Sequence, residues 1–392
     1  NSLDRNPSSS YNGLGFFIML ILSKQDAEYV GQIFIDYYSN FDRIDDYLRK
    51  VKLEKMAERP ASLFGMGPED DMFQDFTMHP NDMEFVCREM PIYDDYIDIV
   101  ASQMIQKSIP GKTLKWVVYE KNTNKIVGFI RFGSPTINSK PRNEFLGKPL
   151  NTTDKDTMKR FNDSTIMGFN IIPTQPFGFN YLGGKLLAAI CTSHYARRAL
   201  NKKYNTNYCM FETTSLYGSS KSSSMYDGMK PYLRFIGLTD SDFVPSINDE
   251  KYHHLKEWFE NKNNGVPLVD AEASSRKLKT QGKMISIIRN SLAKNDSGML
   301  RPFKQCFIDA KNLTERKRQY LGTYGYTNVK EYMNSETDTL VKNVNFDRFE
   351  LENVITWWKK MATKRYENLQ RDGRLRTELE VWSKNSNIDI IR

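Results

Sequence analysis

The sequence predicts an α/β protein of the α+β type, with a mixed sheet, an N-terminal helical arm and a mainly helical C-terminal extension. Runs of β-branched and aromatic residues of strand length lie at 115–120, 126–132 and 166–172. Glycines follow the third run, and apolar residues at helical spacing follow the glycines. This order predicts that a glycine-bearing strand-loop-helix forms the centre of the fold.

A β-hairpin is predicted at 115–132. Its connecting residues, 121–125, contain the Asn and Thr that favour tight turns. Arg131 lies on the second strand between apolar neighbours, so it stands either at a sheet edge or in a cleft, where it could clamp a phosphate or carboxylate. Residues 134–163 are polar and contain prolines, which predicts an insertion between strands.

The strand-loop-helix spans residues 164–191. Residues 166–172 have the composition of a buried strand, which Pro173 ends, while Leu186, Leu187 and Ile190 recur at helical spacing. The glycines between them would allow a ligand to approach the main chain, and a helix N-terminus favours a phosphate there. A tight structural turn without a ligand explains the same glycines, and both interpretations remain open.

Further strands complete the predicted order. Residues 208–216 form a strand candidate, and residues 225–238 end in aromatic-Ile-Gly-Leu. The order of helix, hairpin, strand, phosphate-type loop, helix and strand over 92–240 resembles the GNAT acyltransferase fold. The resemblance implies a GNAT-like mixed sheet and a donor such as acetyl-CoA or a related acyl-CoA.

The resemblance also implies cofactor-binding residues. Gln-Pro-Phe-Gly-Phe-Asn at 175–180 is similar to the family's Gln/Arg-x-x-Gly-x-Gly/Ala loop, with Asn in the last place. An alternative alignment on the helix leucines puts Gly183 in that place. The residues implied to hold the donor are Ile171, Ile172, Gln175, Gly178, Asn180, Gly183, Gly184 and Lys185.

Acyl transfer needs a base for the accepting amine and an acid for the leaving thiolate. Glu212 lies mid-strand among apolar neighbours, where desolvation would raise its pKa and make it a usable base. A purely structural pairing with Arg131 or Lys230 is the alternative. Tyr226 falls where the GNAT family carries its tyrosine acid. Tyr232 is the alternate, because residues 232–237 resemble the family's Tyr-x-x-x-Gly-Phe ending with one extra residue.

A second resemblance is narrower. Asn-Tyr-Leu-Gly-Gly-Lys-Leu-Leu-Ala at 180–188, Phe-Glu-Thr-Thr at 211–214 and the segments 223–227, 233–239 and 317–332 are similar to the Druantia A-type family of phages and anti-phage systems. This resemblance implies a phage or defence setting. GNAT-like enzymes of the Mom type, which modify adenine in DNA, are a more distant analogy.

Charge is distributed unevenly along the chain, whose net charge is +8. Residues 1–110 carry 10 Lys and Arg against 19 Asp and Glu, whereas the remaining residues carry 46 against 29. A basic body favours a polyanionic partner, so we expect nucleic acid, with DNA as the first choice. A solvated surface with lysines that serve solubility is the alternative.

Basic and aromatic residues mix at 315–326 and again at 357–366. Cations grip phosphates and exposed aromatic rings stack on bases, so the mixture suits single-stranded or extruded nucleotides. Core packing of the aromatic residues is the competing explanation. The residues predicted to contact nucleic acid or substrate are Arg131, Ser224, Arg316, Lys317, Arg318 and Tyr320, although Ser224 could instead cap a helix.

Several classes of protein are disfavoured. The four cysteines form no C-x-x-C pair and only four histidines occur, so neither a disulfide framework nor a metal site is predicted. The apolar run at 13–22 is shorter than the roughly 20 residues of a membrane-spanning helix. It also lacks the flanks of a secretory signal, so we expect no membrane association and a cytoplasmic location. The oligomeric state stays open.

Three regions are predicted: an acidic helical or irregular region at 1–90, a GNAT-like core at 91–240, and a basic, aromatic-rich and mainly helical region at 241–392. Within the last region, helices are predicted at 271–293 and 351–366. Three functions are open. The first is a GNAT-like transferase that modifies nucleic acid or a nucleotide with an acyl-CoA-type donor. The second is a non-catalytic module that binds nucleic acid or a partner, and the third is a small-molecule N-acyltransferase.

Overall fold

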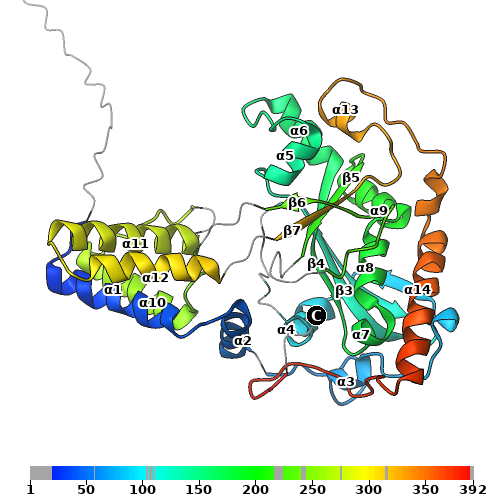
Figure 1. Cartoon of the computed structure of the whole chain (residues 1–392), viewed down its shortest axis with the longest axis horizontal. Helices are drawn as coiled ribbons and strands as arrows, with labels where there is room; N and C mark the ends of the chain where they lie inside the picture. The colour runs from blue at the N-terminus through cyan, green and yellow to red at the C-terminus, as the bar shows by residue number, and fades with distance from the viewer. Residues whose placement is uncertain are drawn as a thin grey trace, which may run out of the picture. The chain divides into compact units, whose positions relative to one another are not determined.

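The structure, a computed structural model, describes residues 20–56, 58–102, 105, 109, 111–215, 224–239, 244–273, 276–313 and 317–388. The chain divides into two compact units (Figure 1). Unit 1 consists of Asn1–Phe41 and Val244–Asn312, and unit 2 consists of Asp42–Phe243 and Leu313–Arg392. The predicted α/β class is confirmed, because the described residues combine a mixed sheet with many helices.

The sheet of unit 2 has seven strands among the described residues, in the order β1-β2-β3-β4-β5-β7-β6. Strands β1 to β4 pair antiparallel, β4 and β5 pair parallel, and β7 pairs antiparallel with both β5 and β6. The strands are β1 (Phe85–Arg88), β2 (Thr113–Glu120), β3 (Lys125–Gly133), β4 (Thr165–Pro173), β5 (Met210–Thr214), β6 (Arg234–Leu238) and β7 (Arg318–Gly322).

The predicted hairpin and central strand are confirmed. Strands β2 and β3 flank a turn in which Asn124 has φ of 53°, a left-handed conformation that Asn tolerates better than most residues. β4 is the fourth strand of the order, antiparallel to β3 and parallel to β5. The sequence did not predict β1, nor β7 within the basic and aromatic segment near 318.

Alternation along β2 directs side chains to two different cores. Trp116 and Val118 join the core that contains α7 (Phe177–Tyr181) and α8 (Gly183–Cys191). Val117 and Tyr119 join the core that contains α4 (Ile92–Val100). Both faces of the sheet are therefore covered (Figure 1). The remaining helical elements of unit 2 are α2 (Ile44–Lys55), α3 (Pro68–Asp71), η1 (Pro80–Asp82), α5 (Lys140–Leu146), α6 (Lys155–Ser164), α9 (His194–Tyr204), α13 (Val329–Met333), η2 (Phe346–Phe349) and α14 (Leu351–Arg371).

The predicted C-terminal helix is confirmed as α14. Its buried residues, Val354, Trp358, Ala362, Tyr366 and Leu369, recur at intervals of three or four and so form one face. Trp358 is fully buried, and its Nε1 donates a hydrogen bond of 3.0 Å to the carbonyl oxygen of Tyr181. This contact joins α14 to the C-terminal end of α7.

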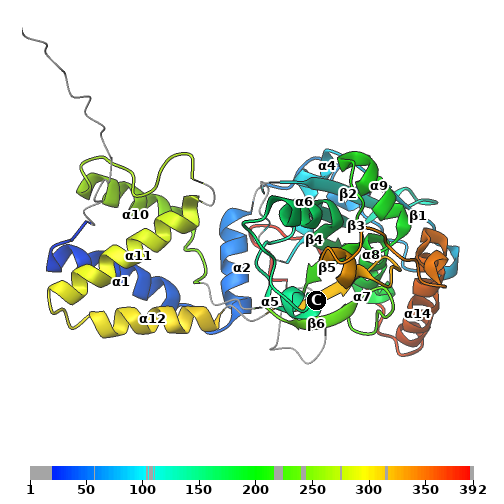
Figure 2. The same ribbon diagram turned by 90° about the horizontal axis from the view of Figure 1, so that it is seen from above.

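Unit 1 is helical throughout its described elements, α1 (Lys24–Ser39), α10 (Asp249–Lys262), α11 (Arg276–Lys294) and α12 (Leu300–Asn312). These helices pack side by side in a bundle (Figure 2). Phe34 of α1 lies in its core, with ring centroids 6.3 Å from Phe303 and 5.7 Å from Phe307. Along the chain, residues 244–312 of this unit separate β6 from β7.

No helix within the described ranges combines the length and apolar character needed to cross a membrane. Most of the apolar run at 13–22 lies outside the described residues.

Trp358→Ala is expected to lower the free energy of unfolding by about 3–5 kcal/mol, because it removes a fully buried indole and its hydrogen bond. Urea unfolding of the full chain measures this loss. Trp357→Ala is the matched control and should cost less, because Trp357 is only partly buried. Equal losses for the two variants would contradict the assignment of the buried face.

Candidate functional site

The first part of the predicted phosphate loop is folded into helix α7, and three of its backbone amides have acceptors within the chain. The N–H of Gly178 donates to the oxygen of Thr174 at 2.8 Å, and that of Asn180 donates to Pro176 at 2.8 Å. The N–H of Phe179 donates to Oε1 of Gln175 at 3.0 Å. Three consecutive amides are therefore already engaged.

Close packing accounts for two of the glycines of this segment. A Cβ on Gly178 would lie 2.7 Å from Cγ of Pro173, and one on Gly183 would lie 2.9 Å from the Cα of Gly178. A Cβ on Gly184 would meet the end of the Met225 side chain, which is flexible and can move aside. The chain's own atoms fill the space at Gly178 and Gly183, as the structural interpretation of these two glycines requires.

The C-terminal segment contacts the same loop. Asn180 donates from Nδ2 to the oxygen of Arg376 at 2.7 Å, and its Oδ1 accepts from the N–H of Arg376 at 3.1 Å. The Phe179 ring lies 4.6 Å from the guanidinium of Arg365 and 3.8 Å from that of Arg376. The N–H of Glu380 donates to the oxygen of Gln175 at 3.0 Å. The chain therefore uses polar groups of the loop for internal contacts.

The other residues predicted to bind the acyl-CoA donor lie in strands and helices. Ile171 and Ile172 on β4 pair with Ile130 and Phe129 on β3. Lys185 lies in the first turn of α8, and its Nζ donates to the oxygen of Asp227. Binding of an acyl-CoA at these positions stays a prediction.

Asp227 forms hydrogen bonds with several of the predicted site residues. It accepts hydrogen bonds from the N–H of Ser224 at 2.9 Å, the hydroxyl of Tyr320 at 2.7 Å and Nη2 of Arg318 at 3.4 Å. Burial works against its ionisation, but these bonds and the charges of Arg318 and Lys185 outweigh burial and lower the pKa of Asp227. The sequence did not single out Asp227, although the segment 223–227 belongs to the narrower resemblance.

The predicted tyrosines lie inside the protein. Tyr226 is buried, which raises the pKa of its hydroxyl, and its ring centroid lies 5.3 Å from that of Tyr320. Tyr232 is 1% exposed, packs 4.9 Å from the Trp357 ring and donates to the oxygen of Arg348 at 3.3 Å. Tyr320 is also 1% exposed, so its ring lies in the core, as the packing explanation expects.

Arg131 and Arg316 complete the predicted set. Arg131 is 3% exposed on β3, opposite Lys115 of β2 and Asn170 of β4. Its charge acts on Tyr93 of α4, where it lowers the pKa against the larger effect of burial. Arg316 lies outside the described residues.

Glu212 of β5 is the centre of a polar cluster on the opposite face of the sheet from Tyr320 and Asp227. Strand pairing places Glu212 and Thr214 on the same face as Gln319 of β7. Nη1 of Arg142 donates to both carboxylate oxygens of Glu212, at 3.2 and 3.0 Å. Nε2 of Gln319 donates to the same carboxylate at 3.3 Å, and Ser139 donates to Oε1 of Gln319 at 2.7 Å.

The ion-pair partner of Glu212 is thus Arg142 of α5, and the two partners that the sequence suggested, Arg131 and Lys230, are wrong.

Burial and hydrogen bonds set the pKa and the position of the Glu212 carboxylate. Burial raises the pKa of Glu212, and the charge and hydrogen bonds of Arg142 oppose that rise. Arg142 is itself fully buried, and its Nη2 donates to the carbonyl oxygens of Thr136, at 2.9 Å, and Ile137. Carbonyls thus fix the guanidinium, which in turn fixes the carboxylate. A held carboxylate with a raised pKa is suited to accept a proton.

Glu212 borders a cavity of about 1050 Å³, which we call the Glu212 pocket. Lys317 also lines it, and burial lowers the pKa of the Lys317 amine. The combination of two carboxylates, a desolvated amine and two further lysines suits a polar or anionic ligand. The lining residues are Thr136, Asn138, Ser139, Lys140, Pro141, Asn143, Glu144, Gly147, Lys148, Pro149, Met167, Glu212, Thr214, Thr239, Lys317 and Gln319.

A family model described as "Druantia protein DruA" matches residues 99–225. The matched part contains Arg142, Glu212 and the predicted phosphate loop, whereas Asp227, β6 and β7 follow it in the chain. The match supports the resemblance to the Druantia A family. No curated protein and no solved structure matches the chain, so the GNAT-like fold stays a prediction.

Gly183→Ala is expected to lower the free energy of unfolding by about 1–3 kcal/mol, because the new Cβ meets the backbone of Gly178 at 2.9 Å. Gly282→Ala on α11 is the control and should be neutral or stabilising, since no atom lies within 4 Å of its Cβ. Thermal or urea unfolding compares them. Full stability of the Gly183 variant would contradict the packing explanation.

Arg142→Met is expected to destabilise the protein by about 3–5 kcal/mol near neutral pH, because it leaves the Glu212 carboxylate buried and unpaired. Without the guanidinium the pKa of Glu212 rises further, so the folded state takes up a proton as the pH falls. The loss should therefore be smaller at about pH 5 than at about pH 8.

Urea unfolding at both pH values measures this difference, and the double variant with Glu212→Gln should recover part of the loss at the higher pH. A loss that is the same at both pH values would contradict the charge-based explanation.

Proposed function

We propose that this chain serves in anti-phage defence by binding nucleic acid through unit 2. The match of residues 99–225 to the Druantia family model supports the defence setting. The basic composition of the chain after residue 110 supports a polyanionic partner. The observation that carries the proposal is a surface of unpaired lysines on helices α9 and α14.

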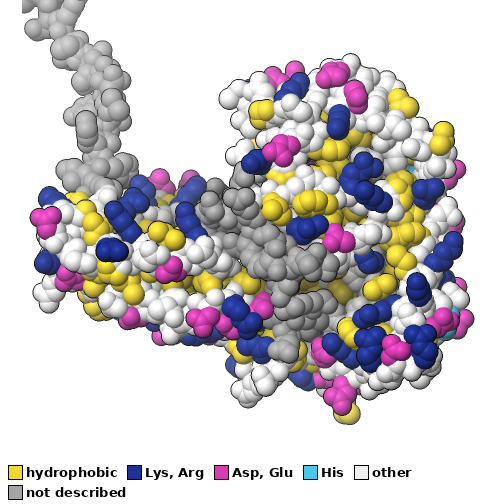
Figure 3. Space-filling view, viewed as in Figure 1, with side chains coloured by type: hydrophobic (Ala, Val, Ile, Leu, Met, Phe, Trp, Pro, Cys, Tyr) yellow, Lys and Arg dark blue, Asp and Glu magenta, His cyan; other side chains and the backbone are white. Residues whose placement is uncertain are grey.

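Helices α9 and α14 form this surface. Helix α9 contains Arg197, Arg198, Lys202 and Lys203 and no acidic residue. Arg198 forms an ion pair of 2.8 Å with Glu350, the residue that precedes α14, so α9 lies close to the N-terminal end of α14. Figure 3 shows Lys and Arg side chains over α9 and α14 on the same face of unit 2.

Three lysines of α9 and α14 are available to a partner. Lys202, Lys360 and Lys364 are exposed, and none of them forms an ion pair with another described residue. We call these three residues the basic surface. By contrast, Lys203 pairs with Glu89 at 2.6 Å. Exposed lysines without carboxylate partners suit phosphates, because binding releases counterions and does not break an internal ion pair.

The basic surface replaces the basic cluster expected near residue 317 as the best-supported contact. Arg318 forms an ion pair of 3.4 Å with Asp227, and its guanidinium lies 4.2 Å from the Phe235 ring. Lys317 lines the Glu212 pocket. These contacts leave the two side chains less available to a phosphate backbone than Lys360 and Lys364.

A transferase that acts on nucleic acid or a nucleotide is the second candidate, and the Glu212 pocket favours it. A buried carboxylate with a raised pKa beside a cavity of about 1050 Å³ could take the proton of an accepting amine. Acetyl-CoA or a related acyl-CoA would be the donor. Calorimetry with acetyl-CoA, together with mass spectrometry of nucleosides from cells with the wild-type protein or Glu212→Gln, tests this candidate. Binding of the acyl donor and a modified nucleoside that depends on Glu212 would support it. If neither is found, nucleic-acid binding without catalysis is the remaining function.

Neutralising the basic surface is expected to weaken the salt dependence of DNA binding. Each phosphate contact contributes about −0.9 to the slope of log K against log salt on duplex DNA, so Lys360→Gln with Lys364→Gln should reduce the slope by about 2. Fluorescence anisotropy with labelled DNA over a range of salt concentrations measures it.

The matched control is Lys283→Gln with Lys304→Gln in unit 1, which removes the same net charge from exposed positions on α11 and α12. The control should keep the wild-type slope. Equal effects of the two double variants, or no binding at low salt, would refute a specific role for the basic surface.

A further inference from the structure

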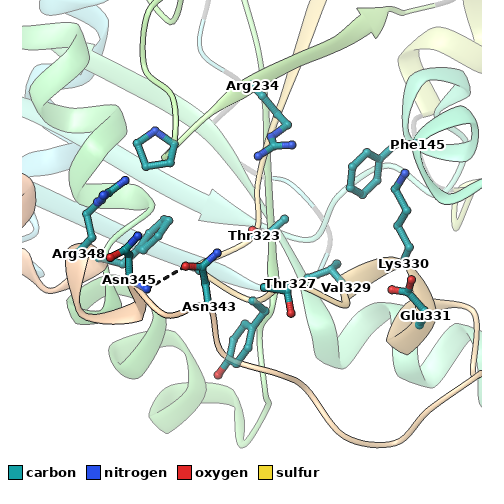
Figure 4. A pocket seen from close by; sticks show the side chains of 14 residues that line it. Phe145, Arg234, Thr323, Thr327, Val329, Lys330, Glu331, Asn343, Asn345 and Arg348 are labelled. Atoms are coloured by element: carbon teal, nitrogen blue, oxygen red, sulfur yellow. Dashed lines mark hydrogen bonds between the residues drawn. The ribbon is translucent and has the colours of Figure 1, made fainter.

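A second cavity of unit 2, of about 490 Å³, lies among segments that are far apart in the sequence. Its lining includes Arg234 of β6, Lys330 of α13 and Arg348 of η2 (Figure 4). We call it the Arg234 pocket. None of the functions considered so far uses it.

The charges of the Arg234 pocket are unbalanced. Arg234, Lys330 and Arg348 are exposed, and none of them forms an ion pair with any residue that the structure describes. Glu331 is the acidic residue among the described lining residues, so the cations exceed the carboxylate by two charges. Figure 4 shows the three cations coming from different sides, with the Arg234 side chain directed toward the middle of the group. Cations that line a concave surface attract an anion, and guanidinium groups suit phosphate oxygens.

The polar part of the lining is held in place. The N–H of Asn345 donates to Oδ1 of Asn343 at 2.8 Å, which orients the Asn343 amide and leaves its Nδ2 as a donor (Figure 4). The N–H of Asn343 donates to the oxygen of Gly325 at 2.8 Å. Tyr324 and Gly325 have φ of 51° and 85°, so this loop adopts a left-handed backbone that its own bonds maintain. The pocket therefore offers positioned hydrogen-bonding groups beside exposed cations.

Aromatic rings line the same cavity. Phe145 and Tyr326 both border it, and Nζ of Lys330 lies 4.7 Å from the centre of the Phe145 ring. Flat rings bind planar bases by stacking, and amide groups bind their edges. The volume falls within the roughly 300–1,000 Å³ of pockets that hold a small molecule.

We propose that the Arg234 pocket binds one nucleotide, with its phosphate on Arg234 and Arg348, its base against the aromatic rings, and Asn343 as a polar contact. The ligand is a free mononucleotide or the phosphorylated end of a nucleic-acid strand, which share this chemistry. The inference rests on the proposed binding of nucleic acid and adds a phosphate-specific site that the basic surface does not provide.

The test uses the full chain and two pairs of probes. The first pair is the four nucleoside 5′-monophosphates and the matching nucleosides, measured by calorimetry. The second pair is a single-stranded oligonucleotide with a 5′-phosphate and the same strand with a 5′-hydroxyl. Arg234→Gln with Arg348→Gln is the variant, and Lys360→Gln with Lys364→Gln is its control, because that control changes the basic surface and leaves the pocket intact.

We expect the phosphorylated member of at least one pair to bind about tenfold or more tightly than its partner, and the arginine variant to abolish that difference while the lysine control retains it. Preference for the monophosphates identifies a free nucleotide, and preference confined to the oligonucleotide identifies a strand end. Both arginines are exposed, so the variant should melt with the wild type.

No phosphate preference in either pair, or a preference that survives the arginine variant, would overturn the inference. If the strand still bound with wild-type salt dependence, the proposed function would stand without this site. Monophosphate binding in a protein that binds no strand would sustain the pocket and refute the proposed function.

Discussion

The insertion of β7 between β5 and β6 is the constraint on which the two polar networks of unit 2 depend. Along this strand, successive side chains point to opposite faces of the sheet. Gln319 therefore reaches the Glu212 carboxylate on one face, while Tyr320 reaches Asp227 on the other. A single strand supplies one member of each network, so a shift of one residue in its pairing would disrupt both.

The cluster around Glu212 has features of a functional site. A buried ion pair is a weak source of stability, because desolvation offsets most of the attraction between the charges, and removing one partner is costly. Here Arg142 is fully buried, and its Nε has no hydrogen-bond partner among the described residues. The pair nevertheless borders a cavity of about 1050 Å³. A buried ion pair that adds little stability and borders a cavity large enough for a ligand is suited to a catalytic role. The Glu212 pocket is therefore the second candidate for function.

Local patterns in the sequence predicted the parts of the fold that local patterns determine, namely the hairpin, which was expected at 115–132 and spans 113–133, the central strand and helices α8, α11 and α14. They could not reveal β7, because its partners β5 and β6 precede a helical insertion of unit 1. The partner of Glu212 was missed for the same reason, since Arg142 lies 70 residues away. The Arg234 pocket likewise exists only where β6, α13 and η2 meet.

We propose that nucleic acid binds unit 2 at the basic surface of α9 and α14. Photo-cross-linking of the full chain to single-stranded DNA with photoreactive bases, followed by mass spectrometry of the cross-linked peptides, tests it most directly. We expect cross-links in peptides of α9 and α14 and in the segments that line the Arg234 pocket, and few in unit 1. Cross-links confined to unit 1, or their absence at low salt, would contradict the claim.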